Sequence, residues 1–77
     1  MEDIKLGIYK HYKGNEYRVL GIATHSENLE KMVVYQALYG EYGIWVRPIS
    51  MWNELVDVNG VKTPRFKLLR EEWFFPF

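Results

Sequence analysis

Apolar and polar residues alternate along short stretches of this chain, and groups of turn-forming residues separate the stretches. The stretches are rich in β-branched and aromatic residues, and Gly14, Gly40, Gly43 and Gly60 recur between them. No segment of about ten or more residues shows a clean 3.6-residue apolar period. The pattern therefore predicts an all-β fold in which successive strands form a meander.

Five strands and one short helical turn are expected from this pattern. Pro48 ends the ladder of the fourth strand because it has no N–H to donate. Pro48 and Ser50 then favour a short helical turn within "PISMWNELV". Residues 58–64, "VNGVKTP", are predicted to be a loop before the last strand. The predicted strands cover residues 7–12, 16–24 or 16–25, 31–39, 44–47 and 65–69.

Two all-β architectures fit this order of elements. One is a small five-strand SH3-like barrel with the helical turn before the last strand. The other is a strongly bent antiparallel sheet with a helix or the chain's last residues across one face. We expect residues 1–77 to form a single domain, with an apolar C-terminal tail at 70–77. The chain has no cysteine, so its stability must come from packing, or from packing plus self-association.

Short hairpins would fix which residues face one another across the strands. They place Gly21 opposite Tyr35, and Tyr35 opposite Arg47. One face of the sheet is then aliphatic, and we expect it to be the core. Its members are Leu20, Ile22, Met32, Val34, Leu38, Ile44 and Val46.

The opposite face is aromatic and partly polar, and it is the best candidate for a binding surface. Arg47 could form bidentate hydrogen bonds to an acidic group, and Tyr35 and Trp45 could supply stacking surface. If the tail covers this face, it is instead a second core. The aromatic face comprises Tyr17, Val19, Gly21, Ala23, His25, Val33, Tyr35, Ala37, Tyr39, Trp45 and Arg47.

The "HSENLE" segment has residue types that occur in catalytic sites. His25, Ser26 and Glu27 are the types of a hydrolytic triad, but consecutive residues rarely align as one, so a polar hairpin turn is favoured. Spacing among the histidines and glutamates matches no usual metal motif, and we predict no metal and no cofactor. A small enzyme with His25 as general base and Glu27 or Glu30 as its partner is the alternative to a binding role.

Charge and hydropathy narrow the possible partners. Ten basic and ten acidic residues cancel. Nucleic acid is therefore not a favoured partner, although a local basic patch stays open. No apolar run approaches the ~18–20 residues of a membrane span, and "MEDIKLGIY" has no signal-peptide pattern. We expect a cytoplasmic protein that does not bind membranes.

The chain also resembles a known family. The segments "GIYKHYKGNEYRVLGIATHSENLEKMVVYQALYG", "WVRPISMWNELV" and "RFKLL" closely resemble the bacterial family called domain of unknown function 1653, over residues 6–69. Asn28 stands where members usually have threonine, and Trp52 where they often have phenylalanine. The resemblance implies a small bacterial cytoplasmic β protein and no particular activity. It draws attention to His25, Ser26, Glu27, Glu30, Tyr35 and Arg47.

Together these observations predict a binding or interaction module for a small acidic or polar ligand or a peptide. The expected ligand-binding residues share the aromatic face or its polar rim. A purely structural dimer, joined through the tail or through an unpaired edge strand, is a further alternative. The expected binding residues are Arg47, Tyr35, Trp45, Tyr39, His25, Glu27 and Glu30.

Overall fold

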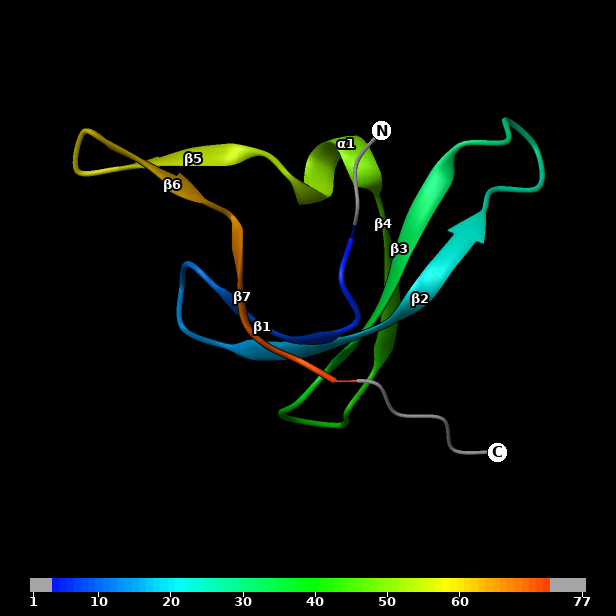
Figure 1. Ribbon diagram of the computed structural model, residues 1–77, viewed down its shortest axis with the longest axis horizontal. Helices are drawn as coiled ribbons and strands as arrows, with labels where there is room; N and C mark the ends of the chain where they lie inside the picture. Colours follow the sequence, from blue (N-terminus) through cyan, green and yellow to red (C-terminus); the bar gives the residue numbers. More distant parts are fainter. Residues whose placement is uncertain (1–3, 73–77) are drawn as a thin grey trace.

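The computed structural model describes residues 4–72, in which seven strands and one short helix form (Figure 1). Five strands make one antiparallel sheet in the order β4-β3-β2-β1-β7, and β5 and β6 make a separate two-stranded sheet. The elements are β1 (Gly7–His11), β2 (Glu16–Thr24), β3 (Lys31–Ala37), β4 (Ile44–Pro48), α1 (Ile49–Trp52), β5 (Leu55–Val58), β6 (Val61–Pro64) and β7 (Phe66–Glu71).

The all-β prediction, the antiparallel pairing and the short helix before the last strand are confirmed. Strand β3 ends two residues earlier than expected because the chain turns there, with positive φ at Gly40 and Tyr42. Within residues 4–72 no pairing joins the edge strands β4 and β7, so no closed barrel is found. The sheet is strongly bent in Figure 1, and the SH3-like barrel stays a prediction.

A hairpin occupies the segment that we predicted to be a loop, and that prediction was wrong. Strand β6 pairs with β5 through a two-residue turn at Asn59 and Gly60. Both turn residues have positive φ, 52° and 82°, as a type I′ turn requires. The Asn-Gly pair between alternating valines was the signal for this hairpin. Figure 1 shows it extending away from the five-stranded sheet.

Irregular pairing bends the sheet at two places. One is between β1 and β7, where the register shifts between Ile8 and Tyr9. Next to it, Gly7 has φ of 153°, and a Cβ there would collide with the carbonyl oxygen of Arg70. Only glycine allows β1 and β7 to approach this closely.

The second irregularity lies between β2 and β3 and changes the predicted register. The pairing shifts between Val19 and Gly21, so Leu20 is an extra residue in the ladder. Gly21 lies opposite Val34 and not opposite Tyr35, because the turn pairs Thr24 with Lys31; beyond the bulge the offset grows, and Val19 lies opposite Tyr35. A bulge of this kind moves every later residue of the strand to the other face. A sequence pattern alone does not reveal it.

The predicted grouping of Tyr35, Trp45 and Arg47 on one face is confirmed, although the predicted partners are off by two residues. Tyr35 lies opposite Trp45, and Arg47 lies opposite Val33. Since alternate residues of a strand share a face, the three side chains lie on the same side of the sheet.

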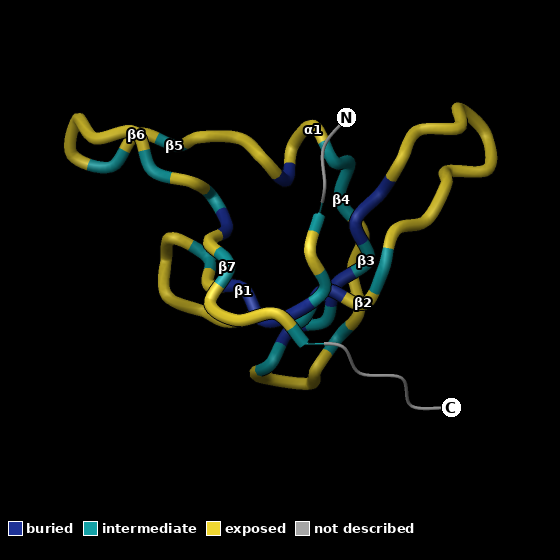
Figure 2. The backbone as a smooth tube through the Cα atoms, in the orientation of Figure 1, coloured by how far each residue is buried: buried dark blue, intermediate teal, exposed yellow. Residues whose placement is uncertain are grey.

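The core lies on the aromatic face, so the prediction of an aliphatic core was wrong. Ile44 and Val46 on the edge strand are 61% and 57% exposed. Figure 2 shows exposed backbone along much of the molecule, with buried positions concentrated where the strands cross. Met32 is buried, and Val34 and Leu38 are partly buried. The main core cluster is Tyr9, Val19, Val33, Tyr35, Trp52 and Phe66.

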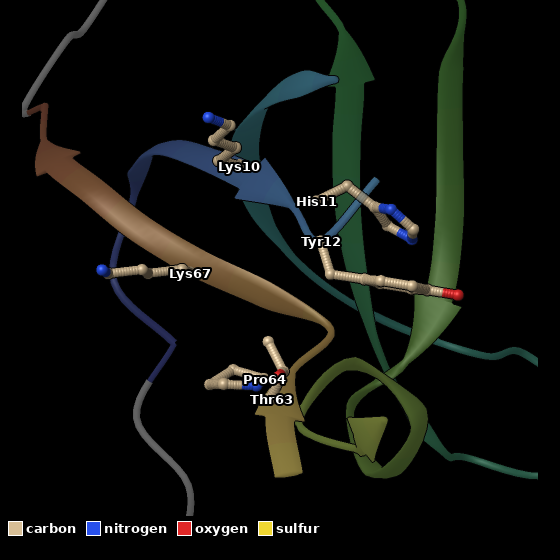
Figure 3. Close-up of a pocket in the computed structure, with 6 residues that line it drawn as sticks. All are labelled: Lys10, His11, Tyr12, Thr63, Pro64 and Lys67. Atoms are coloured by element: carbon tan, nitrogen blue, oxygen red, sulfur yellow. The ribbon is translucent and has the colours of Figure 1, made fainter. Parts of the chain in front are cut away.

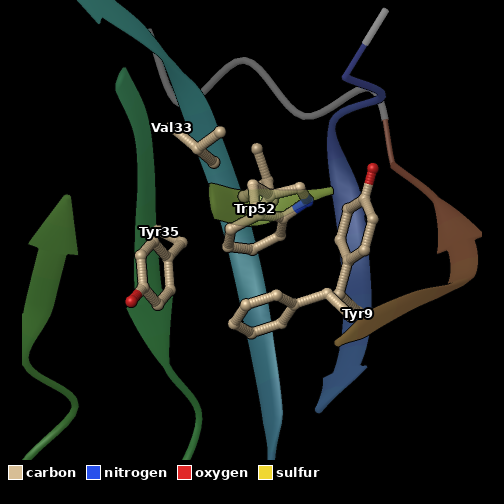
Figure 4. Close-up of a cluster of buried hydrophobic side chains, with 6 residues drawn as sticks. Tyr9, Val33, Tyr35 and Trp52 are labelled. Atoms are coloured by element: carbon tan, nitrogen blue, oxygen red, sulfur yellow. The ribbon is translucent and has the colours of Figure 1, made fainter. Parts of the chain in front are cut away.

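Stacked aromatic rings cover this face of the sheet. Trp52, from α1, stacks on Phe66 with ring centroids 3.8 Å apart and planes 2° apart. Its edge contacts Tyr9 and Tyr35 at 5.3 Å and 5.0 Å. Figure 4 shows Trp52 between these two tyrosines, which come from β1 and β3. The alternative cover, the tail from 73 to 77, lies outside the described residues.

We expect Trp52→Ala to lower the free energy of unfolding by about 3–5 kcal/mol, because it empties the centre of the core. Trp45→Ala is the matched control, since Trp45 is 60% exposed and Trp52 only 2%. Urea denaturation at low protein concentration measures both, and Trp52→Phe serves if the alanine variant does not fold. Similar losses for Trp45→Ala and Trp52→Ala would contradict the assignment of the core.

Candidate functional site

Arg47 is a partly buried cation on the core face of the edge strand β4. Its guanidinium carbon lies 5.7 Å from the ring centroid of Phe66. Its Nε atom is buried and has no hydrogen-bond partner. Within residues 4–72, Arg18, Arg65 and Arg70 each pair with a glutamate, whereas Arg47 forms no ion pair. The ring of Phe66 is therefore the group that stabilises the charge of Arg47, through a cation–π contact.

Tyr17 connects the Arg47 region to the surface. Its ring makes edge contacts with Tyr35, Tyr39 and Phe66 at centroid distances of 5.4, 5.5 and 5.7 Å. The hydroxyl oxygens of Tyr17 and Tyr39 are 2.6 Å apart. Because Tyr39 is exposed, this hydroxyl pair lies at the boundary between the core and solvent.

The hydroxyl of Tyr17 stays protonated at neutral pH. Burial raises the pKa of Tyr17 to about 12, and the hydrogen bond with Tyr39 adds to the effect, while the charge of Arg47 opposes it. In a pair of neutral hydroxyls one donates to the other, and the second keeps its hydrogen for another acceptor. The pair can therefore donate one hydrogen bond to a bound group.

His11 lies at the end of β1, directly opposite Phe66 in β7. Its ring is 5.0 Å from that phenylalanine and 4.6 Å from Tyr12. The backbone N–H of Lys13 donates to Nδ1 of His11 over 3.1 Å, so the proton of the neutral imidazole lies on Nε2. His11 is thus oriented as a hydrogen-bond donor.

Positive charge accumulates around His11. Burial lowers the pKa of His11, and the charges of Arg65, Arg47 and Lys13 lower it further. Arg65 is itself bound to Glu54 at 3.0 Å. The imidazole therefore resists protonation, because a further positive charge would be repelled by its neighbours.

A small pocket lies beside His11, between β1 and the end of the β5–β6 hairpin (Figure 3). Its volume is about 140 Å³. Lys10 and Lys67 lie opposite each other on neighbouring strands here, and neither forms an ion pair within the described chain. The two lysines add positive charge at the pocket, but neither contributes to the shift at His11. Its lining residues are Lys10, His11, Tyr12, Thr63, Pro64 and Lys67.

A neutral chain therefore carries a local basic region, which the composition alone left open. On neighbouring segments, Glu54 binds Arg65 and Glu16 lies across from Lys10. We name the group of Arg47, its ring contacts and its hydrogen-bond donors the Arg47 cluster. It consists of His11, Tyr17, Tyr35, Tyr39, Arg47 and Phe66.

The predicted polar rim lies in the turn between β2 and β3. The backbone N–H of Glu27 donates to Nδ1 of His25 over 3.1 Å, and the backbone of His25 bonds to Leu29 and Glu30. These hydrogen bonds stay within the turn, and His25, Glu27 and Glu30 are all exposed. Among the described contacts, none brings these side chains to Arg47. The turn has the geometry of a polar hairpin end.

Of the other predicted residues, the structure brings Tyr35, Tyr39 and Arg47 together. Tyr35 is 7% exposed, so it forms a wall of the cluster and not an open stacking surface. Trp45 lies beside Tyr35 in the register, and its indole Nε1 packs over Gly43 at the edge of the sheet.

Sequence reasoning did not select His11, Tyr17 or Phe66 for the site. Tyr17 was already on the predicted aromatic face, so its position was a usable signal. His11 and Phe66 belong to strands far apart in the sequence, and only the pairing of β1 with β7 brings them together. Neither has a local motif that would indicate this.

Acidic and histidine side chains within residues 4–72 form no group of three or more that could hold a metal ion. The four-residue α1 is much shorter than a membrane span, and no helix in the described part of the chain is long and apolar enough to cross a bilayer.

Comparison with known proteins places the chain in a family. Residues 7–68 match the family described as protein of unknown function (DUF1653). The chain belongs to the DUF1653 family. A crystal structure of a DUF1653 protein from Bordetella bronchiseptica is similar, with a TM-score of 0.84 and 38% sequence identity over 97% of this chain and 99% of that one. No curated protein matches the chain. The whole Arg47 cluster lies within the DUF1653 match.

We expect the stability of the protein to fall as the pH drops from about 7 to about 5, in part because of His11. The pKa of His11 is lowered in the folded state, so the unfolded chain binds this proton at a higher pH than the folded chain. His11→Gln should make the decrease shallower, as measured by urea unfolding across this pH range. An equal decrease in both proteins would contradict the prediction.

NMR titration measures the pKa of His11 directly and so tests the effect of the same neighbouring charges. The pKa of His11 should lie below its ordinary value of about 6.5 and should rise in Arg47→Met, which removes one neighbouring charge. Arg70→Met is the control, because Arg70 pairs with Glu72 and does not contribute to the shift at His11.

Proposed function

We propose that this DUF1653 protein is a binding module that holds an acidic group of a small ligand or peptide at the Arg47 cluster. The observation that carries the proposal is the partly buried guanidinium of Arg47, which has no carboxylate partner among the described residues. A partly buried charge without a partner costs free energy, and an anionic ligand would offset that cost.

The shape of the cluster supports an acidic group with a flat or apolar body. A guanidinium that lies against an aromatic ring keeps its planar edge for bidentate hydrogen bonds to a carboxylate or phosphate. The neighbouring rings of Tyr17 and Phe66 offer apolar surface for the rest of the ligand.

The polar groups of the cluster favour the same ligand class because they are donors. The hydroxyl pair of Tyr17 and Tyr39 can donate one hydrogen bond to an acceptor, and the Nε2–H of His11 can donate another. A methylated amine or another cation would be repelled by Arg47 and Arg65. An anion is therefore the ligand that the charges around His11 favour.

Neither catalysis nor nucleic-acid binding draws comparable support. Nδ1 of His25 already accepts a backbone hydrogen bond, and the carboxylates of the turn are exposed, so no pocket assembles a general base there. The local basic region is small and the chain is neutral overall, which favours a small ligand over a long polyanion. A cytoplasmic location remains part of the proposal.

Arg47→Met should leave the fold intact and change its free energy of unfolding by no more than about 1 kcal/mol, in the stabilising direction, because it removes a partly buried charge that has no carboxylate partner among the described residues and keeps the apolar stem. Arg65→Met is the matched control and should destabilise by up to about 1 kcal/mol, because it breaks the ion pair with Glu54. Urea unfolding of both variants tests this difference in sign. A clear loss of stability in Arg47→Met would show that Arg47 has a structural partner.

Ligand binding is tested by a thermal-shift screen of dicarboxylates, inorganic phosphate, nucleoside monophosphates and acidic peptides, with choline as a cationic comparison. A ligand present at about 100 times its Kd should stabilise the protein by about 2.7 kcal/mol. Arg47→Met should abolish the shift, whereas Arg18→Met, outside the cluster, should keep it. An anion whose shift survives in Arg47→Met would remove Arg47 from the site and defeat the proposal.

A further inference from the structure

Strand β4 is an edge strand with an apolar surface. It is the last strand at one end of the five-stranded sheet, and no described strand pairs with its outer side. Its first three residues, Ile44, Trp45 and Val46, are 61%, 60% and 57% exposed. Exposed apolar edge strands are unusual in proteins that stay monomeric, because they invite pairing with another strand.

The opposite edge strand, β7, carries charged side chains that discourage pairing with another strand. Strand β7 carries Lys67, Arg70 and Glu71, and these charged side chains are all exposed. Charges on an edge discourage a second strand from pairing there. Strand β4 has a single charge, that of Arg47, which points to the core side of the sheet. The two edges therefore differ, and only β4 has the surface of an interface.

The backbone N–H and C=O groups of β4 that do not bond to β3 are available to pair with another strand. The N–H of Ala37 donates to the carbonyl of Gly43 over 2.9 Å, which fixes the alternation of the β3–β4 ladder. It follows that Trp45 and Arg47 bond to β3, whereas the N–H and C=O groups of Ile44 and Val46 point outward. Two donors and two acceptors therefore lie on the outer edge.

We propose that β4 pairs antiparallel with β4 of a second copy of this chain, about a two-fold axis that passes beside Trp45. In this register Ile44 of one copy lies opposite Val46 of the other, and the four outward N–H groups of the two strands meet four outward C=O groups. The two Trp45 rings become direct cross-strand neighbours on one face, and the aliphatic side chains meet on the other.

A second copy fits this edge because the pairing is self-complementary. Arg47 lies opposite Gly43 of the partner, so no like charges meet. A register shifted to centre on Val46 would place Pro48 opposite Ile44. Pro48 has no N–H, so the outward carbonyl of Ile44 would lose its donor. The register centred on Trp45 satisfies every outward group and is the better one.

The size of the patch sets the expected strength of the dimer. Three apolar side chains that are about 60% exposed can bury on the order of 300 Å² per copy, or about 600 Å² in total. Stable interfaces usually bury about 1,200–2,000 Å², so this pairing belongs to the small class. We expect a dimer that dissociates in the micromolar range or above.

Sedimentation equilibrium from low micromolar to near-millimolar protein should therefore show a reversible monomer–dimer transition. Val46→Lys should weaken the dimer at least tenfold, because it places a charge against the apolar Ile44 of the partner. Val61→Lys is the matched control, since Val61 is also an exposed strand valine, at 63%, but lies on the β5–β6 hairpin. It should leave the dissociation constant unchanged.

A cross-link tests the register. The chain has no cysteine, so Trp45→Cys introduces a single thiol, which should form an intermolecular disulfide under mild oxidation. Val61→Cys is the control and should cross-link far more slowly. A monomer at every concentration, or a dimer that Val46→Lys leaves unchanged, would overturn the proposal. These variants keep Arg47, so their outcome is independent of the ligand-binding proposal.

Discussion

The stack of Trp52 on Phe66 is the interaction on which the rest of this small structure depends. A chain of 77 residues can bury only a thin core, and it has no disulfide to compensate. Two large rings in parallel contact, with tyrosines at their edges, concentrate apolar contact at the centre of the bent sheet. They also decide which face of the sheet is inside, because both rings arrive on the aromatic side.

The Arg47 cluster is a consequence of the same stack. Phe66 contacts Trp52 in the core and also contacts Arg47, His11 and Tyr17 at its border. At its border the core therefore holds hydrogen-bond donors and the cation Arg47 in place, but it supplies no carboxylate to neutralise that charge among the described residues. The ligand site that we propose would be preorganised by this packing, which would lower the ordering cost of binding.

Local patterns predicted most of the elements, whereas the side of the sheet that forms the core could not be predicted from them. The strands β1 to β4, α1 and β7 follow from residue type and turn signals, and even the missed hairpin had an Asn-Gly signal. Tyr35 and Arg47 were correctly placed on one face. The core depended on the contact between Trp52 and Phe66, which lie on either side of the missed hairpin, and the register depended on the β2–β3 turn and on a bulge at Leu20.

The β5–β6 hairpin lies between the two stacked rings in the sequence, yet it leaves their contact undisturbed. Its base is closed by the backbone N–H of Arg65, which donates to the carbonyl of Glu54, and by the ion pair of the same two side chains. Residues 54 and 65 are therefore held next to each other, close to the stacked rings. Whatever chain length separates them is free to change in evolution, because the closed base keeps such changes from the packing of Trp52 on Phe66.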